Sequence, residues 1–507
     1  MSKKILFWID VSLLQFGVAK MLQEKLDDEF YVIYDFNHHL KKSFKNQNII
    51  SFQNEWYYWD HVGKTKKPDL KYLKKIEENY KINLWNVAYI ERNFYQYNPF
   101  YKFKREEILS IFEQECRFFE HVIDEINPDF LIIKTTDFHR NYLLTEMCRA
   151  RGVKILMLFG SRFGVRASIS SQADTFDLHL DEKKINSVNI QSVEDLNRYL
   201  KTHHSFKRNV SSGGMNTSIF KKIIPSLMWL TKTVDEEWKE GYDHYGVTRL
   251  KAISHYFSYS LKGRLRKMFI DRNFKKSINK HEKFVFFSLS VQPERGSEIV
   301  APFYTNQIEV ITNIAKSLPA GYKLYVKEHQ TMEFRHWRDT SYYKKIMTLP
   351  NVKLIHPLFN TKILLENCEL VITVSGTSGL EAALYKKPSI IFADVNYSSI
   401  PSVYRLRSLE DLPNAIRESL KKEVKLSDVN DFINLLDRNS FPFDIFGFYS
   451  KVLERFHVGG FMISNEISMK SLDSFFEEDR EIYEILAAEH IKKINQYKKL
   501  EKTIGPK

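Results

Sequence analysis

The chain has 507 residues, 43% of them hydrophobic, and a formal net charge of +13 from 76 basic and 63 acidic side chains. This length is too great for one compact core and suits two domains, and the positive excess favours anionic partners such as a nucleotide-linked substrate, an acidic membrane surface or nucleic acid. Three isolated cysteines without CxxC spacing argue against a disulfide framework or a structural zinc site and favour a reducing compartment.

The N-terminal residues, MSKKILFWIDVSLLQFGVAKML, resemble a signal peptide, but Asp10 interrupts the apolar stretch and no clear cleavage site follows. We therefore predict a strand at residues 5–9, a helix at 12–26 and a second strand at 30–34. Alternating strands and helices are typical of a parallel sheet. Because the sequence has no run of about 18 apolar residues, we expect no transmembrane helix, a cytoplasmic location, and at most peripheral contact with the inner face of an anionic membrane.

Residues from about 55 to 110 are rich in aromatic side chains interleaved with lysines. This change of character predicts a helical insertion within a first Rossmann-like, acceptor-binding domain at residues 1–200. Exposed aromatic rings could stack on sugars, but aromatic residues at this density more often form a small additional core.

A second unit of strand, loop, helix and strand begins at residues 130–133 and ends at 154–158. In open α/β sheets, ligands bind beyond the carboxyl ends of the strands. Asp137 follows such an end, and a carboxylate there can take a proton from an acceptor hydroxyl, so Asp137 is the leading candidate for a catalytic base. His139 and Asp10 are rivals, and the alternative role for Asp137 is to cap the helix that follows. Arg140 and Arg162 could form structural salt bridges or bind an anionic sugar.

Strand signals are sparse in residues 201–283, which we interpret as a basic helical linker. Lysine and arginine side chains between residues 262 and 276 alternate with Leu265, Met268, Phe269 and Phe274. This mixture is typical of a basic amphipathic helix that could contact anionic lipid, although an ordinary solvated helix is the alternative.

The strand pattern returns at residues 284–289, 323–327, 353–355 and 370–374, which predicts a second Rossmann-like domain at 284–425, followed by a helical tail at 426–507. A Ser/Gly turn at residues 375–379 leads into a predicted helix at 380–386. A helix that begins there directs backbone N–H groups and its positive dipole end toward a phosphate, and Glu381 could accept hydrogen bonds from a ribose. The alternative is a well-capped turn without a ligand.

These residues belong to four blocks, in order, that resemble the capsule polysaccharide biosynthesis family, whose characterised members are Kdo (3-deoxy-octulosonic acid) transferases of two-domain GT-B architecture. The blocks are SVQPE at 290–294, LYVKEH at 324–329, LPNVKL at 349–354, and SGTSGLE at 375–381 followed by KP at 387–388. The first domain resembles the family only in general layout.

The resemblance implies a GT-B-like α/β fold of two Rossmann-like domains that face each other across a cleft, with helical insertions and a helical C-terminal tail. It implies that the donor nucleotide contacts Lys327 and His329, and that Gln292 and Glu294 lie near the cleft. We assign Gln292 to the donor site and Glu294 to the catalytic group with Asp137 and His139. The remaining predicted donor contacts are Ser375, Gly376, Thr377, Ser378, Gly379 and Glu381. Gln330 replaces the proline that commonly follows the family's histidine, which puts CMP as the base in doubt.

The leading hypothesis is a metal-independent glycosyltransferase that moves a sugar from a nucleotide-sugar, such as a CMP-Kdo-like donor, to a surface polysaccharide or glycolipid acceptor, without a further cofactor. No DxD triplet follows an apolar strand, and the pairs His38-His39 and His203-His204 lack metal-ligand spacing. One alternative is a sugar-nucleotide epimerase of the same shape, which needs no acceptor. Another is a non-catalytic polyanion binder, but no nucleic-acid-binding motif supports it, and we expect no nucleic-acid partner.

Overall fold

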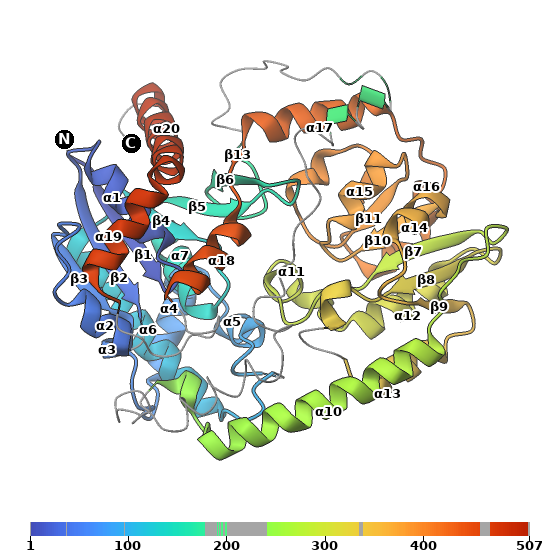
Figure 1. The fold of residues 1–507 in the computed structure, drawn as a ribbon, viewed down its shortest axis with the longest axis horizontal. Helices are drawn as coiled ribbons and strands as arrows, with labels where there is room; N and C mark the ends of the chain where they lie inside the picture. The colour runs from blue at the N-terminus through green and yellow to red at the C-terminus, as the bar shows by residue number, and fades with distance from the viewer. Residues whose placement is uncertain are drawn as a thin grey trace.

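The computed structural model describes residues 2–36, 38–95, 97–177, 190, 192, 194–195, 198–199, 241–333, 338–456 and 467–504. The pair His203-His204 and the side chains of His38 and His39 lie outside this description. Two mainly parallel sheets form two lobes, one from each half of the chain (Figure 1). The expected α/β fold of two Rossmann-like domains with a helical C-terminal tail is confirmed.

The first sheet has the strand order β13-β6-β5-β4-β1-β2-β3. Its five parallel strands are β1 (Lys4–Asp10), β2 (Glu29–Asp35), β3 (Asn54–Tyr57), β4 (Phe130–Lys134) and β5 (Lys154–Gly160). Two antiparallel strands, β6 (Arg166–Ser170) and β13 (Phe441–Pro442), extend it at one edge. The central strands β1, β4 and β5 are buried on both faces and therefore appear in the sequence as nearly continuous apolar runs.

The aromatic segment forms the core on one face of this sheet. The helices on this face are α3 (Tyr58–His61), α4 (Leu70–Tyr80), α5 (Leu84–Ile90), α6 (Arg105–Ile126) and α7 (His139–Ala150). Trp56, Tyr58 and Phe94 pack in the same cluster as Leu6 and Trp8 of β1. The segment is therefore part of the main core of the first domain, and not a small additional core as expected.

The other face of the first sheet is covered by helices from both ends of the chain. They are α1 (Leu14–Gln23), α2 (His38–Phe44), α18 (Ile445–Phe456), α19 (Met469–Glu478) and α20 (Arg480–Ile504) (Figure 1). A Cβ at Gly17 would lie 2.1 Å from the ring of Tyr483, so glycine is needed where α1 and α20 meet. The C-terminal helices thus complete the core of the first domain.

The second sheet is entirely parallel and has the order β12-β11-β10-β7-β8-β9. Its strands are β7 (Phe284–Ser288), β8 (Lys323–Lys327), β9 (Val352–Ile355), β10 (Leu370–Thr373), β11 (Ser389–Ile391) and β12 (Val403–Arg405). The helices around it are α11 (Arg295–Glu298), α12 (Gln307–Ser317), α13 (Thr340–Met347), α14 (Thr361–Asn367), α15 (Ser378–Leu384), α16 (Leu412–Ser419) and α17 (Leu426–Arg438).

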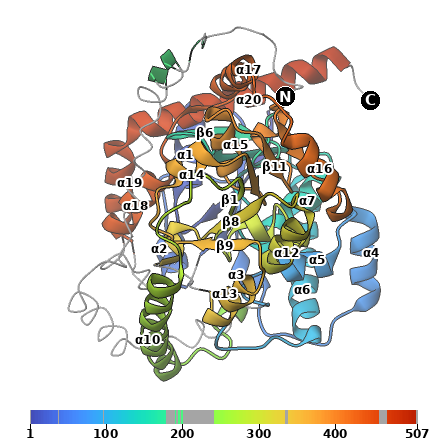
Figure 2. The ribbon, with the colours of Figure 1, turned by 90° about the vertical axis from the view of Figure 1, so that its right-hand side faces the viewer.

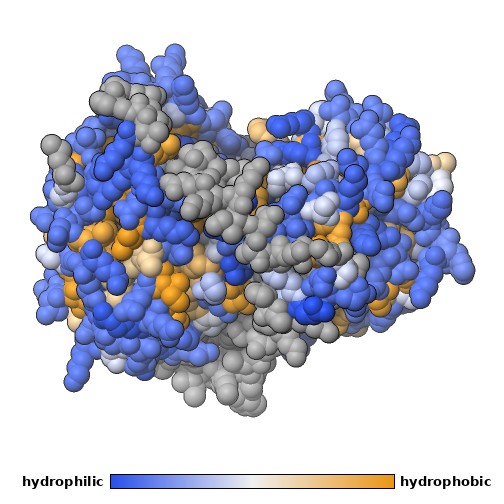
Figure 3. Space-filling view, turned by 90° about the horizontal axis from the view of Figure 1, so that it is seen from above, coloured by the Kyte–Doolittle hydropathy of each residue, from blue (hydrophilic) through white to orange (hydrophobic). Residues whose placement is uncertain are grey.

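One long helix, α10 (Arg249–Asn273), runs along the outside of the molecule from the first domain to the second (Figures 1 and 2). Viewed from above, both lobes are largely hydrophilic where described residues form the surface (Figure 3). Among the described residues, no helix combines the length and apolar character that crossing a membrane requires.

Candidate active site at the domain junction

The strand orders point to one place in each sheet where a ligand is expected. In the first sheet, the strands that follow β1 are added on one side and those that follow β4 on the other. In the second sheet, β7 and β10 are the corresponding neighbours. Ligands of open α/β sheets bind beyond the carboxyl ends of the strands at such switch points. Asp10 is the last residue of β1, Asp137 follows β4, and the Ser/Gly turn follows β10. Three sets of predicted residues therefore lie at the expected edges.

Charged groups join the two domains beside the Ser/Gly turn. The Arg162 Nε donates to Asp174 Oδ1 at 2.6 Å, and another N–H of the same guanidinium donates to the carbonyl of Ser375. Arg295 of the second domain forms an ion pair with the other oxygen of Asp174. Burial by itself would raise the pKa of Asp174, but the two guanidinium groups outweigh burial and lower it. The turn after β10 is thus held against the first domain.

The two glycines of this turn are required by close packing. Neither Gly376 nor Gly379 has a positive φ. A Cβ at Gly376 would lie 2.7 Å from Thr373 Oγ1, and one at Gly379 would lie 2.9 Å from the hydroxyl of Tyr397. The Tyr397 hydroxyl donates to the Gly376 carbonyl, and the Ser375 hydroxyl donates to the Gly296 carbonyl at 2.6 Å. The expected sharp turn is therefore built without left-handed backbone.

The polar side chains after the turn differ in how far their hydrogen bonds are satisfied. The Thr377 hydroxyl donates to Glu381 Oε1 at 3.1 Å. Burial raises the pKa of Glu381, although this hydrogen bond and nearby Lys327 oppose the increase. The Ser378 hydroxyl is buried and has no hydrogen-bond partner in the described part of the chain. Beside the turn, the Thr377 hydroxyl is therefore already hydrogen-bonded, whereas the Ser378 hydroxyl could bond a ligand.

Lys327 is a buried cation without a direct partner among the described residues. It ends β8, next to β7, and its side chain is 7% exposed. Its ammonium group forms no hydrogen bond or ion pair with any described residue; Glu328 and Glu381 act on it only through space. Burial lowers the pKa of Lys327 to about 8. Because a buried charge without a partner is costly, this position favours a bound anion.

His329 follows two residues later and is exposed. Its Nδ1 lies 2.8 Å from the hydroxyl of Thr331, in the short 3-10 turn Gln330–Glu333. Lys327 and His329 thus leave the same strand end, but only Lys327 is desolvated.

Gln292 does not serve as a free donor contact. Its amide NH2 donates to Glu298 Oε1 at 3.1 Å and to the Thr305 carbonyl at 2.8 Å, and its oxygen accepts from Arg338 at 3.1 Å. Arg338 also binds both oxygens of the buried Glu328. That Gln292 contacts the donor stays a prediction; in this structure its amide joins segments of the second domain.

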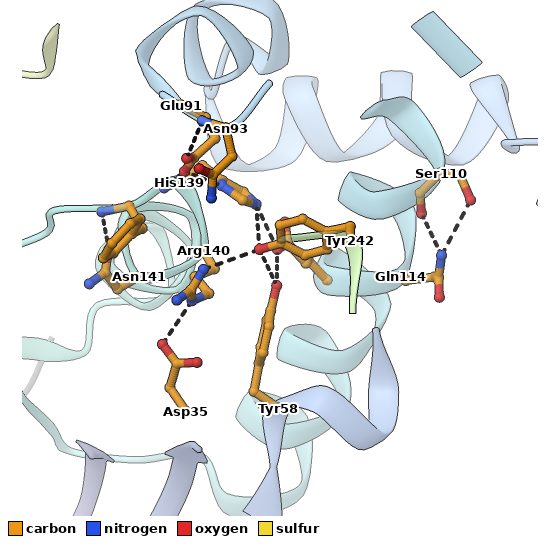
Figure 4. A network of polar contacts seen from close by, with 12 residues as sticks. Asp35, Tyr58, Glu91, Asn93, Ser110, Gln114, His139, Arg140, Asn141 and Tyr242 are labelled. Atoms are coloured by element: carbon orange, nitrogen blue, oxygen red, sulfur yellow. Dashed lines mark hydrogen bonds and ion pairs between the residues drawn. The ribbon is translucent and has the colours of Figure 1, made fainter. Parts of the chain in front are cut away.

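His139 is the second predicted site residue that the structure assigns to the core. Its ring is fully buried, with Nδ1 2.6 Å from Glu91 Oε2 and Nε2 2.8 Å from Glu115 Oε1 (Figure 4). Burial would lower the pKa of His139, but Glu115 and Glu91 outweigh it and raise the pKa to about 9. Conversely, His139 outweighs burial at Glu91 and lowers its pKa to about 2. The predicted catalytic role of His139 is wrong for this geometry, because both nitrogens are occupied away from solvent.

Asp137 and its rival Asp10 have different surroundings. Asp10 is buried and forms an ion pair with Lys134, and it also accepts from the Ser12 hydroxyl at 2.6 Å. Asp137 is half-buried and accepts from the Thr135 hydroxyl at 3.3 Å. The capping alternative for Asp137 is wrong, because the N-cap of α7 is Phe138, whose N–H donates to Asn141.

Asp137 also lies near the domain junction. Its carbonyl accepts from Arg92 at 3.2 Å, and Arg92 acts electrostatically on Glu298 of the second domain. Glu294 precedes α11 and is exposed, close enough to Arg162 to affect its pKa. Asp174, Arg295 and Tyr397 were not predicted from the sequence; Arg295 adjoins one of the four family-like blocks, whereas no local signal marks Asp174. No group of three metal-ligating side chains occurs in the described ranges.

Comparisons with known proteins find a matching family model and similar solved structures. No curated protein matches the chain. Among solved structures, the beta Kdo 2,7 transferase KpsC of Thermosulfurimonas dismutans is 10% identical with a TM-score of 0.30, covering 73% of this chain and 97% of that one. MnaA of S. aureus with UDP is 13% identical, with a TM-score of 0.25 and coverage of 92% and 99%. The calicheamicin glycosyltransferase CalG4 is 11% identical, with a TM-score of 0.25 and coverage of 86% and 94%.

Residues 223–428 match the family model described as capsule polysaccharide biosynthesis protein. This segment contains α10, the whole second sheet, Lys327 and the Ser/Gly turn. The match confirms the resemblance drawn from the four sequence blocks. The similarity of this chain to the capsule polysaccharide biosynthesis family thus extends over residues 223–428.

Proposed function

We propose that this protein is a glycosyltransferase of GT-B type in capsule polysaccharide assembly, with a nucleotide-sugar donor on the second domain and a polysaccharide or glycolipid acceptor on the first. The family match and the contacts that hold the turn after β10 against the first domain support this proposal. We propose the domain boundaries expected from the sequence, with the C-terminal helices packed against the first domain.

The observation that carries the proposal is the buried ammonium of Lys327, which has no direct partner in the described part of the chain. A donor phosphate would give this buried cation the partner that it lacks, and a charge-assisted hydrogen bond there would be stronger than one in water. The unsatisfied Ser378 hydroxyl can donate to the same anion. The rest of the proposed phosphate site is formed by the backbone of the turn, including Gly376 and Thr377.

Glu381 is our candidate contact for the ribose, because its carboxylate already accepts from Thr377 and lies in the electrostatic range of Lys327. His329 is an outer contact to the phosphate or sugar. As the bond to the leaving phosphate breaks, negative charge grows on that phosphate, and a fixed cation such as Lys327 stabilises it.

On the acceptor side, we propose Asp137 as the general base. Its carboxylate receives one 3.3 Å hydrogen bond from Thr135 among the described residues and is half-buried at the end of β4. A carboxylate in this position can accept the proton of an acceptor hydroxyl as that oxygen attacks the donor sugar. Glu294, exposed on the second domain, is the neighbouring acidic group.

A thermal-shift panel with CMP, UDP, GDP and CDP tests the donor site. We expect one nucleotide to raise the melting temperature of the wild type, and Lys327→Met to lose most of that shift. Lys323→Met is the matched control, because Lys323 begins the same strand but pairs with Glu282 at 2.7 Å. No shift with any nucleotide, or equal shifts in both variants, would contradict the proposed donor site.

A donor-only assay separates transfer from epimerisation. A glycosyltransferase needs an acceptor for turnover, whereas an epimerase would convert the nucleotide-sugar alone. We expect product only when an acceptor saccharide or glycolipid is present.

A further inference from the structure

The outer helix α10 is held at its ends. Near its C-terminus, Ile270 is buried in the core of the second domain, and Arg266 forms an ion pair with Asp339 at 3.3 Å. Toward its N-terminus, His255 contacts the ring of Phe100 at 5.3 Å between centroids. Between these contacts the helix runs along the outside of both lobes (Figures 1 and 2).

The exposed side of α10 is apolar along most of its length. Its five large apolar residues are 57% to 79% exposed: Leu250, Phe257, Leu261, Leu265 and Met268. Their spacings of about seven, four, four and three residues keep them on one face of a helix. This face extends for roughly 27 Å at 1.5 Å per residue. Such a row of large side chains is not typical of a solvated helix, whose apolar residues are scattered.

The same helix is strongly basic. Arg249–Asn273 contains seven lysine and arginine residues and one acidic residue, Asp271. Asp271 is paired with His356 at 2.9 Å and with Lys267 at 3.6 Å, so it adds no free negative charge. Lys251, Lys262 and Arg264 are exposed beside the apolar row. Because two copies of this helix would repel each other, the charge disfavours self-association and favours an anionic surface.

We propose that α10 binds the surface of an anionic lipid bilayer, lying in the interface with its apolar row among the acyl chains and its basic side chains at the headgroups. Helices that lie in the interface combine these two features. Long lysine and arginine side chains can reach the headgroups while the apolar row is buried. Since α10 joins both domains, this contact orients the whole molecule at the membrane. The inference does not depend on the proposed function, because vesicle binding needs neither donor nor acceptor.

Vesicle flotation of the full chain tests the proposal. We expect the wild type to float with vesicles of phosphatidylcholine containing about one-third phosphatidylglycerol, to float weakly with phosphatidylcholine alone, and to dissociate as salt is raised. We expect Phe257→Ser/Leu261→Ser and, separately, Lys262→Glu/Arg264→Glu to lower the affinity for anionic vesicles about tenfold or more.

Matched controls separate α10 from general surface effects. Leu70→Ser/Leu358→Ser removes two apolar residues that are 52% and 53% exposed elsewhere, and Lys421→Glu/Lys422→Glu makes the same charge change on another exposed segment. Both controls should bind vesicles like the wild type, and all variants should keep the wild-type melting temperature. The proposal is overturned if the wild type does not bind anionic vesicles, if the α10 variants bind like their controls, or if the apolar variant only converts a dimer to a monomer.

Discussion

His139 in the first domain and Lys327 in the second are both buried cationic residues near the carboxyl ends of strands, yet their surroundings are opposite. His139 lies between two carboxylates, and the pKa of its ring is raised to about 9. The ammonium of Lys327 has no direct partner among the described residues, and its pKa is lowered to about 8. The comparison teaches that burial alone does not mark a functional residue. A paired buried charge holds the fold together, whereas an unpaired one is available to a ligand.

The largest expected effect is the loss of stability when His139 is removed. His139→Ala leaves Glu91 and Glu115 buried without their shared partner, which should cost about 3–5 kcal/mol of unfolding free energy. His121→Ala is the control, because the exposed His121 pairs with Glu125 on the surface of α6 and should cost below about 1 kcal/mol. Urea unfolding measures both. Similar losses of unfolding free energy in the two variants would contradict a stabilising role for the buried pairing of His139.

A second pair of variants applies the same reasoning to the carboxylates of the first domain. Asp137→Asn should lower the transfer rate about 10²- to 10⁴-fold with little change in melting temperature, because a general base is lost and no ion pair is broken. Asp10→Asn should instead lower the melting temperature, because Lys134 loses its partner. Steady-state kinetics and thermal melts check both. If Asp137→Asn transfers sugar at the wild-type rate, Asp137 is not the base.

Lys327→Met should have a smaller effect on stability, and of opposite sign to His139→Ala. Replacing a desolvated ammonium with an apolar side chain of similar length should leave the unfolding free energy unchanged or raise it by about 1 kcal/mol without ligand. Urea unfolding in the absence of nucleotide measures this difference. A loss comparable to that of His139→Ala would mean that Lys327 is structurally paired.

The smallest expected effect is the pH dependence of the free energy of unfolding, which distinguishes His139 from Lys327 most directly. The folded state raises the pKa of His139 from 6.5 to about 9, so its stabilisation is complete below pH 6.5 and is lost as pH rises through 9. The folded state lowers the pKa of Lys327 from 10.5 to about 8. Between about pH 8 and 10.5 the unfolded chain therefore binds more protons than the folded chain, and the free energy of unfolding rises with pH.

The stability difference between His139→Ala and the wild type should therefore shrink from pH 6.5 to 9. Any advantage of Lys327→Met should persist to about pH 8 and shrink above it. Urea unfolding across this range measures both slopes. Parallel slopes in the two variants would show that the two cations do not differ as the structure indicates.

Much of the fold could be predicted because the sheets are parallel and buried. The strands expected at 284–289 and 370–374 correspond to β7 (Phe284–Ser288) and β10 (Leu370–Thr373), since short apolar runs at this spacing have few alternatives. The helix expected at 380–386 begins two residues earlier, at Ser378, because the hydroxyl-rich turn already has helical backbone at Thr377.

The sequence could not show how the polar groups of the candidate site are engaged, because their partners come from distant parts of the chain. His139 is paired with Glu91 and Glu115, 48 and 24 residues away. Gln292 is bound by Arg338, 46 residues away. Residue type and position at a strand end are local properties that the sequence displays. Whether a polar group remains available depends on segments that meet only in the folded chain.

The sequence by itself determined the two parallel sheets, the edge at which ligands are expected, and the presence there of Lys327 and the Ser/Gly turn, because periodicity and strand ends are local. Only the tertiary structure decided that Arg162 reaches Ser375, 213 residues away, and that the C-terminal helices complete the first domain. It also decided that Lys327, unlike His139, lacks a direct partner in the described chain. Desolvation and charge pairing arise from contacts between remote segments, so they appear only when those segments are packed together.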